Sequence, residues 1–308
     1  MKHALSTAIA AALSIIALQA TPAEAQTRVF VAAQGSDSNP CTLSQPCRSF
    51  QKAHETVAAN GEINVLDPAG YGAVTITKAI SIQGHGFAGF DVTAGADAIT
   101  INAGPSDKIN LRGLLLDGVA LGRNGITFNT GASLNIQDCL VRNFTRAGIH
   151  FKPSALSNLY VSNTLTLDST IGVAVESSGS ATATVTLSHV ELDNNVYGLY
   201  VFSQGPVNVT LSDSVVAHNN GAGVEVIPED RSPNVVMVRN STIANSPSGI
   251  GVHSATEFNN AIVRITKSTI TGNNVSAQVY ASGQIFSYGD NNIDGNNTNA
   301  LPVTIPLH

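Results

Sequence analysis

The chain has 308 residues, of which 43% are hydrophobic and 12% charged, so it can bury a large core and is not a disordered tail. Its 15 Lys and Arg residues against 21 Asp and Glu residues give a net charge of −6. This charge argues against a protein that binds nucleic-acid phosphates. Trp is absent, and Val, Ile, Thr, Ser and Asn are abundant, a mixture typical of short strands and tight turns.

The first 25 residues have the three parts of a secretory signal peptide. A positively charged start precedes an apolar run that ends at Ala20, and Ala23 and Ala25 form a small-residue cleavage pattern. The apolar run is interrupted by polar residues, and no later stretch approaches the ~20 apolar residues that a membrane span needs. We therefore expect cleavage after Ala25, no membrane span, and a secreted protein, periplasmic or extracellular.

Residues 26–61 are expected to form an N-terminal cap with a disulfide loop and a helix. Cys41 and Cys47 lie in a Pro- and Ser-rich segment, and in an oxidising compartment they should pair. A metal site there would need two more ligands nearby, and the sequence has none. The next segment predicts a lid helix with Ser49 at its N-cap and Gly61 just past its end. Its apolar stripe consists of Phe50, Ala53, Val57 and Ala58.

The middle of the chain repeats with a period of about 25 residues. One Gly opens the last short strand of each unit, and these residues are Gly125, Gly148, Gly172, Gly198, Gly223 and Gly249. The steps between them are 23, 24, 26, 25 and 26 residues, as in stacked coils whose loops absorb insertions. Each unit holds three short runs of alternating apolar residues separated by turn residues, a pattern that predicts strands.

These features predict an all-β fold, a right-handed parallel β-helix whose coils stack about 4.8 Å apart. A leucine-rich repeat has a similar period, but here Val, Ile and Thr fill the apolar positions and helix-forming charged residues are scarce. The six-residue period of left-handed coils is absent, and parallel crossovers are usually right-handed. We expect the β-helix over residues 62–300, a tail at residues 301–308, and Cys139 as a buried, inert thiol.

Asn residues precede the repeated Gly in most units, and stacking should place them above one another. The members of this row are Asn143, Asn194, Asn219 and Asn245, with Asp168 in the same place and Asn273 or Asn274 one unit on. Amide side chains tolerate left-handed backbone at bends and satisfy turn groups there. The row therefore predicts a structural ladder rather than a binding site.

In its coil pattern, the chain resembles the right-handed parallel β-helix proteins of the pectate-lyase-like superfamily over most of residues 28–300. The resemblance includes the N-terminal cap segments VAAQGSDSNPC and PCRSFQKA. That superfamily contains pectate and alginate lyases, polygalacturonases, uronan epimerases and phage tailspikes. The resemblance implies contact with carbohydrate and no particular reaction.

The catalytic motifs of that superfamily are matched only in part. Gly84–Gly86 is similar to the G-H-G of polygalacturonases, but the acidic motifs that precede it there are missing, so we expect a tight corner. Arg231–Pro233 begins the R-x-P-x-x-R of pectate lyases, but Val236 stands in the sixth place, which favours a loop. Glu229 and Asp230 would bind Ca²⁺ only weakly, because a dedicated site needs about six oxygen ligands. We expect no cofactor and no dedicated metal site.

The strand that follows each repeated Gly offers a candidate binding surface. If its apolar residues point inward, alternation turns His150, Lys152, Glu176, Tyr200, Phe202, Glu225, Ile227 and His253 outward in two columns. His150 and Tyr200 would lie two coils apart, near 10 Å at about 4.8 Å per coil, with Glu225 one coil further. The candidate acid and base groups are His150, Tyr200 and Glu225. The candidate contacts to a substrate are Lys152, Glu176, Phe202 and His253.

Two functions stay open at this point. One is a protein that binds a cell-wall or extracellular polysaccharide without catalysis, which the incomplete motifs favour. The alternative is a lyase or C5-epimerase that acts on a uronate-containing glycan. In the plainest interpretation Lys152 and Glu176 form a surface ion pair. Tyr200, Phe202 and Ile227 then belong to an ordinary exposed patch.

Overall fold

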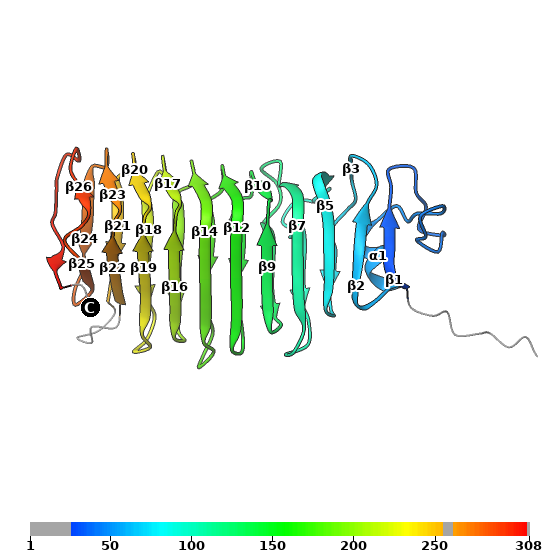
Figure 1. Ribbon diagram of the computed structural model, residues 1–308, viewed down its shortest axis with the longest axis horizontal. Coiled ribbons are helices and arrows are strands. Elements are labelled where there is room, and N and C mark those ends of the chain that lie inside the picture. The colour runs from blue at the N-terminus through cyan, green and yellow to red at the C-terminus, as the bar shows by residue number, and fades with distance from the viewer. Residues whose placement is uncertain (1–25, 255–260, 307–308) are drawn as a thin grey trace, which may run out of the picture.

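The computed structural model describes residues 26–254 and 261–306, which wind into an elongated column of about nine coils (Figure 1). Strands of successive coils pair in parallel, for example β12 (Ser157–Leu167) with β14 (Ala183–Asp193). The all-β parallel solenoid predicted from the repeat is confirmed. No helix in the described part of the chain is long and apolar enough to cross a membrane. The predicted signal peptide, residues 1–25, lies outside the described residues.

Two sheets run along the column. Sheet B takes one strand from each coil: β4 (Val74–Ile76), β6 (Ile99–Asn102), β8 (Asn124–Thr130), β11 (Ala147–Phe151), β13 (Ile171–Val175), β15 (Tyr197–Ser203), β18 (Ala222–Pro228), β21 (Ser248–Val252) and β24 (Val275–Val279). In the described part of the chain, sheet A has 18 strands, because many coils contribute two strands separated by a bend. The other strands of sheet A, besides β12 and β14, are β1 (Gln26–Val31), β2 (Val57–Val65), β3 (Ala69–Gly70), β5 (Ile80–Gly89), β7 (Lys108–Asp117), β9 (Ser133–Gln137), β10 (Leu140–Arg142), β16 (Val207–Ser212), β17 (Val215–Ala217), β19 (Asn234–Arg239), β20 (Thr242–Ala244), β22 (Ala261–Thr266), β23 (Thr269–Thr271), β25 (Gln284–Ser287), β26 (Asn292–Ile293) and β27 (Val303–Thr304).

Both ends of the described chain join sheet A. β1 pairs with β2, and β27 pairs with β25. The sheet therefore already begins within residues 26–61 and extends into residues 301–308.

A short helix, α1 (Phe50–Thr56), lies at the N-terminal end of the column beside β1 and β2 (Figure 1). Ser49 is its N-cap, as predicted, and the Ser49 side chain accepts a hydrogen bond from the backbone N–H of Lys52. The predicted end near Gly61 is wrong, because Val57 already has extended backbone and begins β2. A β-branched residue such as Val suits that extended conformation better than a helix.

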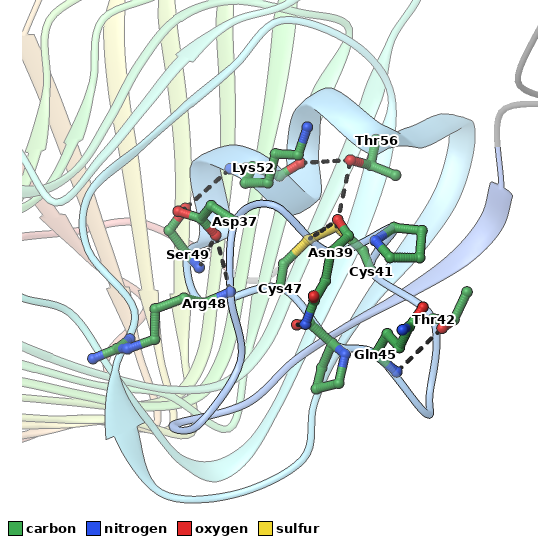
Figure 2. The surroundings of a disulfide bond; sticks show 12 residues. Asp37, Asn39, Cys41, Thr42, Gln45, Cys47, Arg48, Ser49, Lys52 and Thr56 are labelled. Carbon is green, nitrogen blue, oxygen red and sulfur yellow. Dashed lines mark hydrogen bonds between the residues drawn. A yellow bond between two sulfur atoms is a disulfide. The ribbon is translucent and has the colours of Figure 1, made fainter.

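Cys41 and Cys47 form the predicted disulfide in the loop between β1 and α1 (Figure 2). Asp37 connects this loop to the start of the helix. Its carboxylate accepts hydrogen bonds from the backbone N–H groups of Arg48 and Ser49 and from the Ser49 hydroxyl. The loop is therefore held both covalently and by charge-assisted hydrogen bonds.

The inward side chains of successive coils stack into one continuous core. On sheet B the inward row is fully buried and consists of Ile149, Val173, Leu199, Val224 and Ile250. Cys139, the free cysteine, is also buried, and this burial raises the pKa of its thiol to about 11. The prediction of a buried thiol is confirmed, and its raised pKa keeps it uncharged and unreactive.

The repeated glycines are explained by the close approach of neighbouring coils. A Cβ atom added at any of the six would lie 2.5–3.0 Å from a backbone carbonyl oxygen of the next coil. Contacts of that length are strongly repulsive, so a side chain would push the coils apart. The glycine period that marks the repeat therefore follows from stacking.

The predicted amide ladder is present, but it splits into two rows. The first row lies at the bend before sheet B, has left-handed backbone, and consists of Asn143, Asp168, Asn194, His218 and Asn245. The second row is buried one residue later and consists of Ser169, Asn195, Asn219, Ser246 and Asn273. Each backbone N–H of the second row, up to Ser246, donates to the side-chain oxygen of the next member. Asn219 belongs to this buried row, not to the row of Asn194.

Asn219→Ala is expected to lower the free energy of unfolding by about 2 kcal/mol. The change removes the acceptor of the Asn195 N–H and the donor to the Leu192 carbonyl, and each orphaned buried group costs about 1 kcal/mol or more. Chemical denaturation measures the loss. Asn220→Ala, at the neighbouring exposed position, is the control and should be nearly neutral. Equal losses in both variants would contradict a stabilising role for the ladder.

Candidate functional site

The outward side of sheet B carries the candidate residues in two columns. The pairing register places His150, Ala174, Tyr200, Glu225 and Gly251 on successive coils of the first column. The second column lies two residues later in each coil, within the strand or directly after its end, and consists of Lys152, Glu176, Phe202, Ile227 and His253. The predicted separation of His150 and Tyr200 by two coils is confirmed.

His150 and Glu176 form a charged cluster with Arg146. His150 Nε2 lies 2.9 Å from Glu176 Oε2, and Arg146 Nη2 lies 2.5 Å from Glu176 Oε1. Burial by itself would raise the pKa of Glu176. The hydrogen bond and charge of His150, together with the charge of Arg146, outweigh burial and lower that pKa to about 2. Glu176 is therefore an anion fixed between two basic side chains.

Two expectations about this cluster need correction. His150 is only 5% exposed, although alternation turns it toward the outer face, because neighbouring side chains cover it. Within residues 26–254 and 261–306, Glu176 makes its ion pairs with Arg146 and His150, and none with Lys152. The repeat pattern did not single out Arg146, because this residue lies in the bend before the strand. Alternation does not predict which way a side chain points in a bend.

A second carboxylate–imidazole pair lies further along the column. Glu225 Oε1 is 2.5 Å from His253 Nε2, and the Glu225 side chain is 10% exposed against 33% for His253. Burial raises the pKa of Glu225, although the charge of His253 acts in the opposite direction. Gly251 makes room for this carboxylate, because a Cβ there would overlap the Glu225 oxygens. Tyr280, which the sequence did not single out, stacks on His253 with 4.1 Å between ring centroids.

Three aromatic residues, Tyr197, Tyr200 and Phe202, lie between the two pairs, and we call them the aromatic patch. The ring centroids of Tyr197 and Tyr200 are 5.0 Å apart, and those of Tyr200 and Phe202 are 6.0 Å apart. All three side chains are half-buried. Burial, assisted by Tyr197 and Glu225, raises the pKa of Tyr200, so its phenol stays protonated at neutral pH. The patch offers ring faces and hydroxyl groups on one surface.

A hollow of about 270 Å³ adjoins the patch. Lys152, Glu176, Phe202 and Glu229 line it, together with Ser177, Ser178 and Gln204. Three of the four predicted contact residues therefore meet there, while His253 lies apart, with Glu225. In the described part of the chain, the Lys152 ammonium group is exposed and makes no ion pair. It is the cation of this hollow that can accept an external anion.

The remaining motifs lie outside the two columns. Gly84–Gly86 is in β5 of sheet A, and Arg231–Pro233 is in the loop after β18, as predicted. Of the acidic residues next to this loop, Glu229 reaches the hollow. No group of three or more His, Cys, Asp or Glu side chains that could hold a metal ion is found among the residues that the structure describes.

No protein-family model matches this sequence, and no curated protein matches it. A solved structure does match: the pectate lyase Pel9A superposes on 84% of this chain and 74% of its own, with a TM-score of 0.64 at 14% sequence identity. This chain is a parallel β-helix protein with the pectate-lyase-like fold. The A-modules of the mannuronan C-5 epimerases AlgE4 and AlgE6 of Azotobacter vinelandii also match this β-helix protein. They cover 81% and 85% of it at 14% and 13% identity, with TM-scores of 0.42 and 0.44.

Proposed function

We propose that this β-helix protein binds a polysaccharide along the outward face of sheet B. The observation that carries the proposal is the aromatic patch, with one carboxylate–imidazole pair on each side of it. Aromatic side chains present flat apolar faces with a polar handle, which suits the apolar face of a sugar ring. Of the flanking charged groups, Arg146 and His253 are partly exposed and can hydrogen-bond sugar hydroxyls. The fold, shared with a pectate lyase, supports a glycan as the ligand.

The position of Lys152 favours a uronate-containing glycan of a cell wall or extracellular matrix. Its ammonium group is exposed at the hollow beside Phe202, whereas the neighbouring Glu176 already has two basic partners. A sugar ring stacked on Phe202 would place a carboxylate substituent within reach of Lys152. A glycan chain would then follow the columns across successive coils, which rise about 4.8 Å each.

The same proposal includes a secreted, right-handed β-helix with a covered N-terminal end. The disulfide supports export after cleavage near Ala25, because disulfides persist in oxidising compartments. The right hand is the usual one for parallel crossovers. Helix α1 packs against β1, β2 and β4 at the N-terminal end of the column (Figure 1), which supports a role as the lid over the first coil.

The second candidate function is a lyase or C5-epimerase that acts on the same class of glycan. The observation that favours it is the Glu225–His253 pair, in which a buried carboxylate orients a partly exposed imidazole. Such an arrangement produces a general base, and Tyr200 lies one coil away from Glu225 as a proton donor. His150 is less suited to this role, since Glu176 and Arg146 already hold its ring.

One experiment separates the two functions. Polygalacturonate, alginate and a neutral glucan are incubated with the protein in deuterated water, with and without Ca²⁺. Retention of each polymer and the mass of each product are then measured. Retention of the uronans without chemical change supports binding. Unsaturated ends or deuterium at C5 that disappear in His253→Asn or Tyr200→Phe would establish the enzyme. If no uronan is retained or changed, both functions are wrong.

A further inference from the structure

Sheet A carries a groove of its own, separate from the sheet B face. Two adjoining hollows of about 490 and 470 Å³ share Gly86 and Asp138 in their walls. The first is built from β5, β7 and the bend before β10, and the second continues to β12 and β14. Together they follow the column axis over successive coils. We call them the sheet A groove; none of the candidate residues of sheet B lines it.

The G-H-G motif builds one end of this groove. The register between β5 and β7 shifts between Gln83 and Ala88, so residues 84–87 bulge out of the sheet. His85 and Gly86 have φ angles of 56° and 84°, in the left-handed region that a bulge requires. The tight corner expected from the sequence is thus a β-bulge. It places the exposed His85 ring at the rim of the groove.

Three leucines form the floor of the groove. Leu115, Leu140 and Leu165 lie above one another on β7, β10 and β12, and Glu191 follows on the next coil. The three leucines are half-buried on the outer side of the sheet, where a strand that faces water usually carries polar residues. This outward row of leucines gives the groove an apolar floor that a ligand can contact.

A row of polar side chains forms the wall. Asp138, Asn163 and His189 occupy the left-handed bend on successive coils. Asp138 is neutralised by Arg112, whose Nε donates to its carboxylate at 2.8 Å. Asn163 donates its side-chain N–H to Asp138, and its side-chain oxygen accepts no hydrogen bond from the residues that the structure describes. His189 contacts Ser188 through Nδ1, so Nε2 is available to a ligand.

Two groups of the groove are without a protein partner. Across residues 26–254 and 261–306, the Glu191 carboxylate and the ring nitrogens of His85 make no hydrogen bond or ion pair. Because Arg112 and Asp138 form an ion pair, the Glu191 carboxylate is the acidic group of the groove that lacks a basic partner among the described residues. An anionic ligand such as a polyuronate is therefore repelled, and a neutral ligand with N–H donors is favoured.

We propose that the sheet A groove binds an oligosaccharide of N-acetylated amino sugars. The acetamido group combines an apolar methyl with an N–H donor and a carbonyl acceptor. The methyl group packs on the leucine floor, the N–H donates to Glu191, and the carbonyl or ring hydroxyls accept from His189 or His85. A sugar without this substituent leaves the leucines against hydroxyl groups, which costs binding energy. This site is additional to the polysaccharide face of sheet B.

The test uses the β-1,4-linked trimer of N-acetylglucosamine, with the corresponding glucose trimer as the matched control. Saturation-transfer NMR identifies the protons in contact, and calorimetry measures the affinity. We expect the strongest transfer at the acetyl methyl groups and binding at least about tenfold tighter than for the glucose trimer. Leu140→Asn and Glu191→Gln should each weaken binding about tenfold, since one removes apolar floor and the other the charged acceptor.

Two variants serve as controls. Tyr160→Ala, on the exposed outer face of β12 but outside the groove, and Tyr200→Ala, on sheet B, should leave binding of the trimer unchanged. Glu191 is exposed, so its variant tests the site without risk to folding. Equal affinity for the two trimers would overturn the proposal, as would tighter binding of a neutral leucine-containing peptide. Loss of binding in Tyr200→Ala alone would assign the trimer to sheet B and likewise overturn it, without affecting the function proposed for that face.

Discussion

The double substitution Tyr200→Ala, Phe202→Ala is expected to weaken binding of polygalacturonate by about 50-fold. Each aromatic contact contributes about 1 kcal/mol beyond the area it buries, and the two rings are stacked with 6.0 Å between their centroids, so one sugar unit can contact both. Two such contacts, with the apolar area that is lost, correspond to about 2–3 kcal/mol, and each 1.4 kcal/mol is tenfold in affinity. Calorimetric titration of the polymer measures the change.

The matched control for this prediction is Tyr160→Ala. Tyr160 is 40% exposed on the outer face of sheet A, so its substitution removes an aromatic surface of similar type from a face without the candidate residues. Its affinity for the polymer should remain that of the unmodified protein. An unchanged affinity in the double variant, with the fold preserved by circular dichroism, would refute the aromatic patch as the contact surface.

Glu176→Ala is expected to destabilise the protein by about 3–5 kcal/mol at pH 7. The substitution leaves Arg146 and the largely buried His150 without their carboxylate, and removing one partner of a buried charged cluster has an effect of this size. Denaturant-induced unfolding at pH 7 measures it. Glu191→Ala removes an exposed carboxylate that has no partner within residues 26–254 and 261–306, so it is the control and should be nearly neutral.

The pKa of Glu176 also predicts how stability depends on pH. Its ordinary value of 4.5 is lowered to about 2 in the folded chain, so the folded state favours the charged form. This preference contributes about 3 kcal/mol above pH 4.5, and the contribution is lost as the pH falls from about 4.5 to about 2. Unfolding free energies between pH 7 and pH 2 should therefore decline less steeply in Glu176→Ala. An equally steep decline in the variant would show that Glu176 does not supply this contribution.

The fold could be read from the sequence because its signals are local and repeated. Steps of 23 to 26 residues between glycines recur over six units, and the structure explains them by the close contact of each Gly with the next coil. The disulfide was predictable for a similar reason, since Cys41 and Cys47 are near in sequence. The end of α1 was not, because the extended backbone of Val57 belongs to the pairing of β2 with its neighbours.

The sequence predicted which column each candidate residue occupies, but not which side chain it contacts. Alternation and the repeat placed His150, Tyr200 and Glu225 in one column, and the observed register agrees. Alternation predicts the side of the sheet on which a side chain lies, but not the side chain that it contacts. Glu176 therefore pairs with Arg146 from the bend, and Tyr280 stacks on His253 from the following coil, contacts that have no signature in the sequence.

By itself, the sequence determined the coil period, the parallel β-solenoid, the disulfide and the two outward columns, because each depends on neighbouring residues or on a strict repeat. The tertiary structure alone decided which charges are buried and paired, and that residues 84–87 bulge to close one end of a groove on sheet A. These features arise where side chains from different coils meet at bends. There the packing of several coils, rather than the alternation along one strand, determines the direction and the environment of each group.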